Sequence, residues 1–193
     1  KKLSNNKNGS KTGLIAGAKV DITANDIDNS GQIRQNTHTE GETTSISDSV
    51  KINVKGGTFT NSGIISGYNV QVMGDNFKLV NTKDGVIVAA DNQYPYGAGN
   101  ITITAKEIDN AGNIRTGGTG SSNNINITAE ILNNIGYILA QKGNITIKTS
   151  KSLTNSGESP IDGSSSIKSL GLLIRALPIA NICCSPPDRV PAN

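Results

Sequence analysis

The chain has few of the residues that usually build a globular core or a chemical site. Only 3% of its 193 residues are aromatic, none is tryptophan, and 34% are hydrophobic. A globular domain of this length usually contains large aromatic anchors. The single histidine is His38, and the sequence has no phosphate-binding loop, calcium-binding repeat or Gly-x-Ser-x-Gly motif. We therefore expect no enzyme, and no catalytic, cofactor-binding or metal-binding residue.

The cysteines, prolines and charged residues argue against several further classes of protein. Cys183 and Cys184 are adjacent, so they cannot staple distant segments or form a metal site. Five of the six prolines lie at position 160 or beyond, which leaves the earlier chain free to form central strands. The net charge of +3 comes from scattered lysines without interleaved aromatics, which argues against nucleic-acid binding. Arg175 and Pro178 interrupt the apolar run of the tail, which argues against stable membrane insertion.

One stretch, ITITAKEIDNAGNI at 101–114, organises the sequence. Ile101, Ile103 and Ala105 alternate with polar residues, the period-two pattern of a strand with one buried face. Ile108 points inward again, and the Asn-x-Gly at 110–112 predicts a turn, because asparagine tolerates left-handed backbone and glycine reaches positive φ. An inward column then restarts at residue 114.

This stretch recurs with apolar starts at residues 20, 50, 70, 101, 125 and 145. Five of the six copies end in Asn-x-Gly, which gives the predicted turn residues Asn29, Gly31, Asn61, Gly63, Asn110, Gly112, Asn134, Gly136, Asn155 and Gly157. A period of 20 to 24 residues is typical of a solenoid, whose units bury their apolar faces only by stacking. We predict an all-β, right-handed parallel β-helix of about six to seven coils. Its inward column should contain Ile101, Ile103, Ile125, Ile127, Ile145 and Ile147.

The domain organisation follows the repeats. Residues 1–12 form a polar lead-in or an incomplete coil, residues 13–160 form the solenoid, and residues 161–193 form a divergent tail. In that tail, Ile167, Leu170, Ile174 and Leu177 have helical spacing, so we expect either a short helix that caps the last coil or a disordered segment. Residues 13–16 resemble the end of an earlier coil, so we expect the chain to be part of a longer solenoid.

Two polar insertions interrupt the repeat at residues 34–49 and 89–99. Both fall at the same place in a coil, so both should leave the same edge of the rod. The second insertion contains Tyr94 and Tyr96, with Asp91 and Asn92 beside them, and tyrosines are favoured in binding surfaces. This insertion is therefore the predicted contact loop. A plain surface loop without a ligand is the alternative.

The pattern I-x-I-x-A-x-x-I-x-N-x-G-x-I resembles the haemagglutinin-type repeats of filamentous haemagglutinin-like exoproteins, over roughly residues 13 to 160. The resemblance implies a protein that two-partner secretion exports through an outer-membrane transporter to the bacterial surface. Members of that family act as adhesins or as stalks of contact-dependent growth-inhibition toxins. The implied partner is a receptor or glycan on a host or neighbouring cell.

Three functions are compatible with this sequence. The first is a rod segment of a secreted adhesin, and the second is a passive toxin stalk. The third is a β-helix enzyme that cleaves acidic polysaccharides, which would need carboxylates and a base gathered on one face. The predicted outward residues of the repeat strand are instead mostly threonine and asparagine, namely Asp21, Thr23, Asn53, Thr102, Thr104, Asn126, Thr128 and Thr146. An enzyme is therefore the least favoured.

Overall fold

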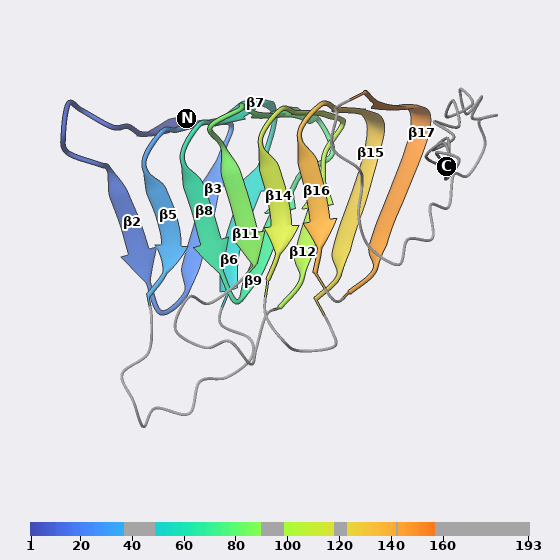
Figure 1. Ribbon diagram of the computed structural model, residues 1–193. Coiled ribbons are helices and arrows are strands. Elements are labelled where there is room, and N and C mark those ends of the chain that lie inside the picture. Colours follow the sequence, from blue (N-terminus) through green and yellow to red (C-terminus); the bar gives the residue numbers. More distant parts are fainter. Residues whose placement is uncertain (37–48, 90–98, 118–122, 142, 157–193) are drawn as a thin grey trace, which may run out of the picture.

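The computed structural model describes residues 1–36, 49–89, 99–117, 123–141 and 143–156. Within these ranges every regular element is a β-strand, and the strands wind into a solenoid with three faces (Figure 1). No helix that could cross a membrane occurs among the described residues. The strands pair in parallel throughout the three faces, as an alternating repeat that stacks on its own copies requires.

The three faces are named here from their positions in Figure 1. The front sheet contains β2 (Leu14–Gly17), β5 (Gln32–Gln35), β8 (Ile64–Gly67), β11 (Val86–Ala89), β14 (Asn113–Thr116) and β16 (Tyr137–Ala140). The back sheet contains β3 (Val20–Ala24), β6 (Ser49–Val54), β9 (Asn69–Met73) and β12 (Ile101–Thr104). The top sheet contains β1 (Lys2–Asn5), β4 (Asp26–Asn29), β7 (Gly57–Asn61), β10 (Phe77–Asn81) and β13 (Glu107–Asn110).

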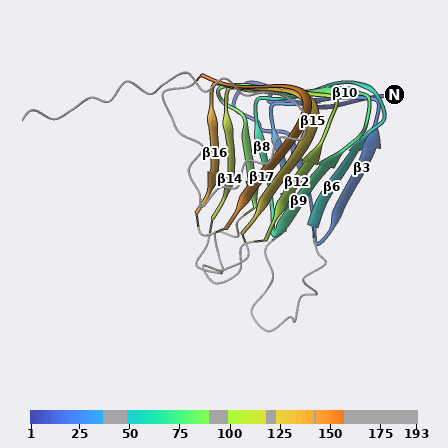
Figure 2. The same cartoon turned by 90° about the vertical axis from the view of Figure 1, so that its right-hand side faces the viewer.

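Two long strands, β15 (Ile125–Asn134) and β17 (Ile145–Asn155), bend from the back sheet into the top sheet and join them. The chain runs down the front, up the back and over the top to the front while it advances toward the C-terminal end (Figures 1 and 2). This path is right-handed, which confirms the predicted fold class. The stack also includes β1, upstream of the solenoid start predicted at residue 13.

The register confirms the alignment of the six repeats. The back-sheet pairs place the six apolar starts, Val20, Val50, Val70, Ile101, Ile125 and Ile145, in one column. Ile103, Ile127 and Ile147 form the next inward column, and these side chains are at most 1% exposed. Each buried aliphatic side chain of this kind contributes about 1.5 to 3 kcal/mol before chain entropy is subtracted.

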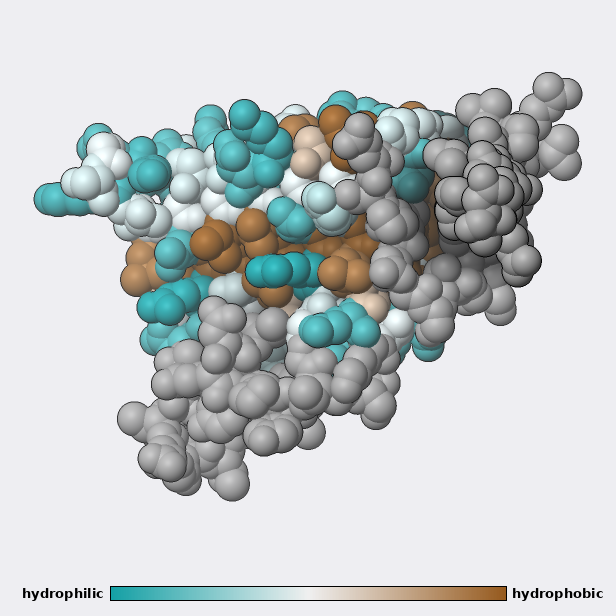
Figure 3. All heavy atoms as spheres, viewed as in Figure 1, coloured by the Kyte–Doolittle hydropathy of each residue, from teal (hydrophilic) through white to brown (hydrophobic). Residues whose placement is uncertain are grey.

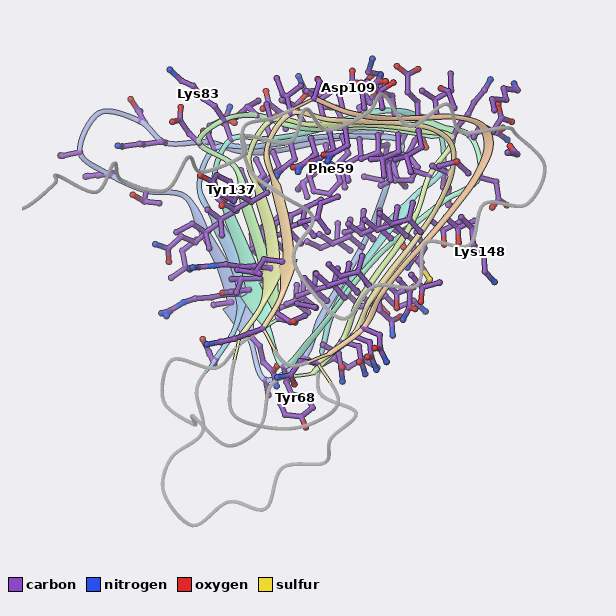
Figure 4. All side chains as sticks on the ribbon, turned by 45° about the vertical axis from the view of Figure 1, so that its right-hand side comes forward. Phe59, Tyr68, Lys83, Asp109, Tyr137 and Lys148 are labelled. Atoms are coloured by element: carbon purple, nitrogen blue, oxygen red, sulfur yellow. The ribbon has the colours of Figure 1, made fainter. Side chains whose placement is uncertain are left out.

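The interior is narrow and almost entirely aliphatic. Ile27, Ile108 and Leu132 point inward from the top sheet, and Ile33 and Ile114 point inward from the front sheet. Among the buried residues that the structure describes, Phe59 and Phe77 are the only large aromatic ones, and Phe59 projects into the interior of the solenoid in Figure 4. A solenoid can be stable without aromatic anchors because each coil covers the apolar face of the next.

A ladder of asparagines runs through the corner between the top and front sheets. The Nδ2 of each member donates to the Oδ1 of the member in the next coil, over 2.6 to 2.8 Å, in the order Asn5, Asn29, Asn61, Asn81, Asn110, Asn134 and Asn155. From Asn29 to Asn134 these side chains are at most 1% exposed. Backbone amides of the following coil donate to their carbonyl oxygens, for example from Gly136 to Asn110. The ladder therefore satisfies buried polar groups in register with the core.

The conformational reason given above for the Asn-x-Gly turns is wrong. No described residue other than glycine has positive φ, and among the described glycines only Gly9 and Gly57 do. Glycine is needed instead because the coils approach closely at this corner. A Cβ on Gly112 would lie 2.2 Å from the carbonyl oxygen of Gly85, and one on Gly136 would lie 2.2 Å from that of Gly112. Gly157 lies outside the described residues.

Candidate binding surfaces

The corner where the front sheet passes to the back sheet is called the loop edge, and it lies at the lower side of Figure 1. The insertion predicted at 34–49 overlaps the end of β5 and the start of β6 and connects these strands, and the insertion predicted at 89–99 overlaps the end of β11 and connects it to β12. The described ends of both insertions therefore lie at this edge, which confirms their predicted common origin. The link from β14 to β15 leaves it here as well.

Amide side chains also order the loop edge. Asn69, Asn100 and Asn124 each accept, through Oδ1, the backbone amide of the equivalent residue one coil on, over 2.8 to 2.9 Å. The backbone amide of Tyr68 donates to Oε1 of Gln35 over 2.9 Å, and Tyr68 lies at this corner in Figure 4. The bases of the insertions are thus held by hydrogen bonds between coils. The sequence signal was an asparagine directly before the apolar start of four copies, which the repeat analysis overlooked.

The predicted contact residues Tyr94, Tyr96, Asp91 and Asn92 lie outside the described residues. Their flanks are described: Ala89 ends β11 and is buried, and a Cβ on Gly99 would lie 2.1 Å from the carbonyl oxygen of Tyr68. The insertion therefore begins and ends on tightly packed backbone. His38 also lies outside the described residues.

The back sheet presents the polar surface that the repeat predicts. Its outward side chains, which include Thr102, Thr104, Asn126 and Thr128, are half-buried or exposed. Asn53 donates to the Asp21 carboxylate over 3.3 Å, so an outward acid is engaged by an amide. Across the ranges that the structure describes, no three His, Cys, Asp or Glu side chains gather as a possible metal site.

The top sheet carries a charged cluster that the sequence analysis did not single out. The Nζ of Lys78 on β10 lies 2.6 Å from Glu107 and 2.5 Å from Asp109 on β13. Asn133 donates to the Asp109 carboxylate over 2.9 Å. Partial burial acts to raise the pKa of Asp109, but hydrogen bonds from Lys78 and Asn133 and the charge of Lys78 outweigh it and lower that pKa below its ordinary value. Figure 4 shows Asp109 pointing outward from this sheet.

This cluster predicts a small loss of folding stability at acid pH. Because the pKa of Asp109 is lowered on folding, its stabilising contribution is present above the unfolded-state value near 3.8 and is lost as pH falls through the folded-state value. The side chains are about one-third exposed, so the pair should contribute no more than about 1 kcal/mol. From pH ~6 to pH ~2, the thermal midpoint of Lys78→Met should fall less than that of the natural chain. An equal fall in both would contradict the pairing, and Lys148→Met is the control.

The front sheet has a different outward surface, with exposed apolar side chains along the rod (Figure 3). Ile64 and Tyr137 are 40% and 50% exposed, and Val86, Val88 and Leu139 are half-buried. Two exposed arginines, Arg34 and Arg115, share this face and lie on register-equivalent positions of β5 and β14. This surface was not predicted from the sequence, although its signal is visible as the related motifs GQIR at 31–34 and GNIR at 112–115.

These observations define the protein as a parallel β-helix. Asparagine side chains form hydrogen bonds between coils at two of its corners, insertions interrupt the repeat at one edge, and one apolar face carries two arginines. Comparisons of the chain with protein-family models, with curated proteins and with solved structures find no match. The predicted haemagglutinin-type family, secretion route and cell-surface location therefore stay predictions.

Proposed function

We propose that this chain is a surface-exposed rod segment of a secreted bacterial adhesin, which attaches to a receptor or glycan on another cell. The observation that carries the proposal is the common origin of the insertions at one edge of a rigid stack of coils. A scaffold that anchors variable loops side by side is a common way to build a binding surface. The stack supplies stiffness, and the loop edge supplies contact.

The interactions within the stack support a role in which the rod extends from a cell surface into solvent. Each coil buries its aliphatic residues against its neighbours, and the asparagine ladder satisfies polar groups at the corner. The sequence offers no disulfide framework to the coils, since both cysteines lie in the tail. Coil-by-coil stacking also suits export of an extended chain through an outer-membrane transporter, because a repeat can nucleate folding and propagate it.

The proposal is tested by the binding of the chain to mammalian and bacterial cells and to a glycan array. The variant replaces residues 90–98, which contain Tyr94 and Tyr96, by a short glycine turn. Binding should fall about tenfold or more, as expected when aromatic anchors of a binding surface are removed. The matched control shortens residues 118–122, which lie between β14 and β15 in the sequence and contain no tyrosine.

Each outcome decides between the functions. Binding that is lost with 90–98 and kept with the 118–122 control supports the adhesin. Equal loss in both variants, with intact thermal unfolding, would contradict the assignment of contact to the tyrosine loop. No binding by the natural chain to any cell or glycan would contradict the adhesin and favour the passive stalk of a toxin. The release of unsaturated products from acidic polysaccharides would instead indicate the β-helix enzyme.

A further inference from the structure

The outward residues of the front sheet form two columns along the rod. One column contains Leu14, Gln32, Ile64, Val86, Asn113 and Tyr137, and the other contains Ala16, Arg34, Ser66, Val88, Arg115 and Leu139. The only charged residues in these columns are the two arginines. Neither guanidinium forms an ion pair with another described residue, whereas Asp28, Glu107 and Asp109 of the top sheet are paired with lysines. The face therefore combines apolar surface with positive charge that no carboxylate in these columns balances.

The register places the polar groups in a repeated arrangement. On β5, Gln32 and Arg34 lie on one strand, and on β14, Asn113 and Arg115 occupy the equivalent positions three strands further along. Three strand spacings of about 4.8 Å separate the arginines by roughly 14 Å. Ile64, Val86 and Val88 lie between them. Each of these two strands thus presents a site with one guanidinium and one amide on its outward side. Apolar surface lies between the two sites.

Tyr137 completes the second of these sites. It lies directly beside Asn113 on the neighbouring strand, with Leu139 beside Arg115, and Figure 4 shows it projecting outward from the front sheet. An exposed tyrosine ring offers a flat apolar surface with a hydroxyl at its tip. An aromatic ring, an amide and a guanidinium on adjacent strands can together contact the C–H face, the hydroxyls and the carboxylate of an acidic sugar.

We propose that the front sheet binds a carboxylated polysaccharide, a chain of uronic acid units, that lies along the rod over Tyr137, Asn113, Arg115 and Arg34. The planar carboxylate matches the paired donors of arginine. The rise of one sugar unit in an extended chain is close to the strand spacing of about 4.8 Å, so successive units can follow successive strands. The inference goes beyond the loop edge, because it assigns a ligand class to a second surface of the proposed adhesin.

A second copy of the chain fits this face less well. Pairing two front sheets would bring four guanidinium groups together without a carboxylate in either pair of columns. The footprint of six strands of four residues is about 29 Å by about 13 Å, or roughly 380 Å². A stable protein interface needs about 800 Å² from each partner. A linear acidic ligand needs neither that area nor a second source of positive charge.

The experiment measures binding of the full chain to an oligogalacturonate by calorimetry, at low and at physiological salt. A neutral oligosaccharide and a sulfated one serve as comparison ligands. The variants are Arg115→Ala, Arg115→Lys and Tyr137→Ala, all at exposed positions, so the coil stack should be unaffected. The matched control is Lys148→Ala, which removes one exposed positive charge from the back sheet, where Figure 4 shows it.

The expected result is oligogalacturonate binding that Arg115→Ala weakens about tenfold or more, as the loss of hydrogen bonds to a charged group predicts. Lys148→Ala should weaken it less than about twofold. Arg115→Lys should restore only part of the affinity, because lysine lacks the paired donors. Tyr137→Ala should weaken binding without changing its salt dependence.

Several results would overturn the inference. Equal weakening by Arg115→Ala and Lys148→Ala, or equal affinity for the sulfated ligand, would indicate unspecific attraction of polyanions. Absence of oligogalacturonate binding would also overturn it. Concentration-dependent dimers that Ile64→Lys abolishes, in a chain that binds no oligogalacturonate, would assign the face to a second copy. Absence of oligogalacturonate binding, together with cell binding that is lost with residues 90–98, would overturn this inference and leave the proposed adhesive function standing.

Discussion

Replacement of Ile103 by aspartate is expected to unfold the central coils. Ile103 is fully buried between Val72 and Ile127 of the neighbouring coils, so a carboxylate there would lie in an aliphatic column without a partner. The loss of the aliphatic side chain and the burial of a charge should together cost about 4 kcal/mol or more. Thermal unfolding followed by circular dichroism measures the effect.

The control for this variant is Thr102→Asp, on the same strand but on the outward face. The new carboxylate there stays in contact with solvent, and surface changes of this kind usually stay within about 0.5 kcal/mol. Ile103→Val should cost about 0.5 to 1.5 kcal/mol, which separates loss of volume from introduction of charge. Equal midpoints for Ile103→Asp and Thr102→Asp would contradict the inward direction of Ile103.

The second large effect is expected from Asn134→Ala, because it interrupts the asparagine ladder. Asn134 accepts a hydrogen bond from Asn110 over 2.6 Å and donates to Asn155 over 2.7 Å and to the carbonyl oxygen of Gly136 over 3.1 Å. The substitution leaves the Asn110 donor without its acceptor in a fully buried corner. We expect a loss of about 2 to 4 kcal/mol in the free energy of unfolding, measured by denaturant titration.

The adjacent residue provides a matched control for the ladder. Asn133 points outward and donates to the Asp109 carboxylate, so Asn133→Ala removes the same amide group from a half-buried position. Its cost should stay below about 1 kcal/mol. If the two alanine variants were equally stable, the buried ladder would not be a major source of stability. A larger cost at Asn133 would contradict the inward and outward assignment of the two asparagines.

The sequence was sufficient to predict the fold because the same physical constraint acts in every coil. Alternation at 101–105 set the inward face, and recurrence of the apolar starts set the register that the back-sheet pairs show. What periodicity could not distinguish was the role of the asparagines. A turn residue and a buried ladder residue have the same spacing in the sequence, and only the three-dimensional stack shows that Asn110 lies between Asn81 and Asn134.

The surfaces were less predictable than the core. The common edge of the insertions followed from their position in the repeat, because every coil turns at the same corners. The front face did not, because Arg34 and Arg115 are 81 residues apart in the chain and meet on one face only when the coils stack. The charged cluster of Lys78, Glu107 and Asp109 was not predicted for the same reason, because these residues meet only when the coils stack.

An electron–electron distance shows whether residues far apart in the sequence stack in register along one rod. Spin labels at Lys51→Cys and Thr146→Cys, with Cys183 and Cys184 changed to serine, lie in one outward column of the back sheet, four strand steps apart. The stacked β-helix requires a narrow distribution near 19 Å, about four spacings of roughly 4.8 Å. A broad distribution, or one centred several strand spacings away, would contradict the stacked β-helix.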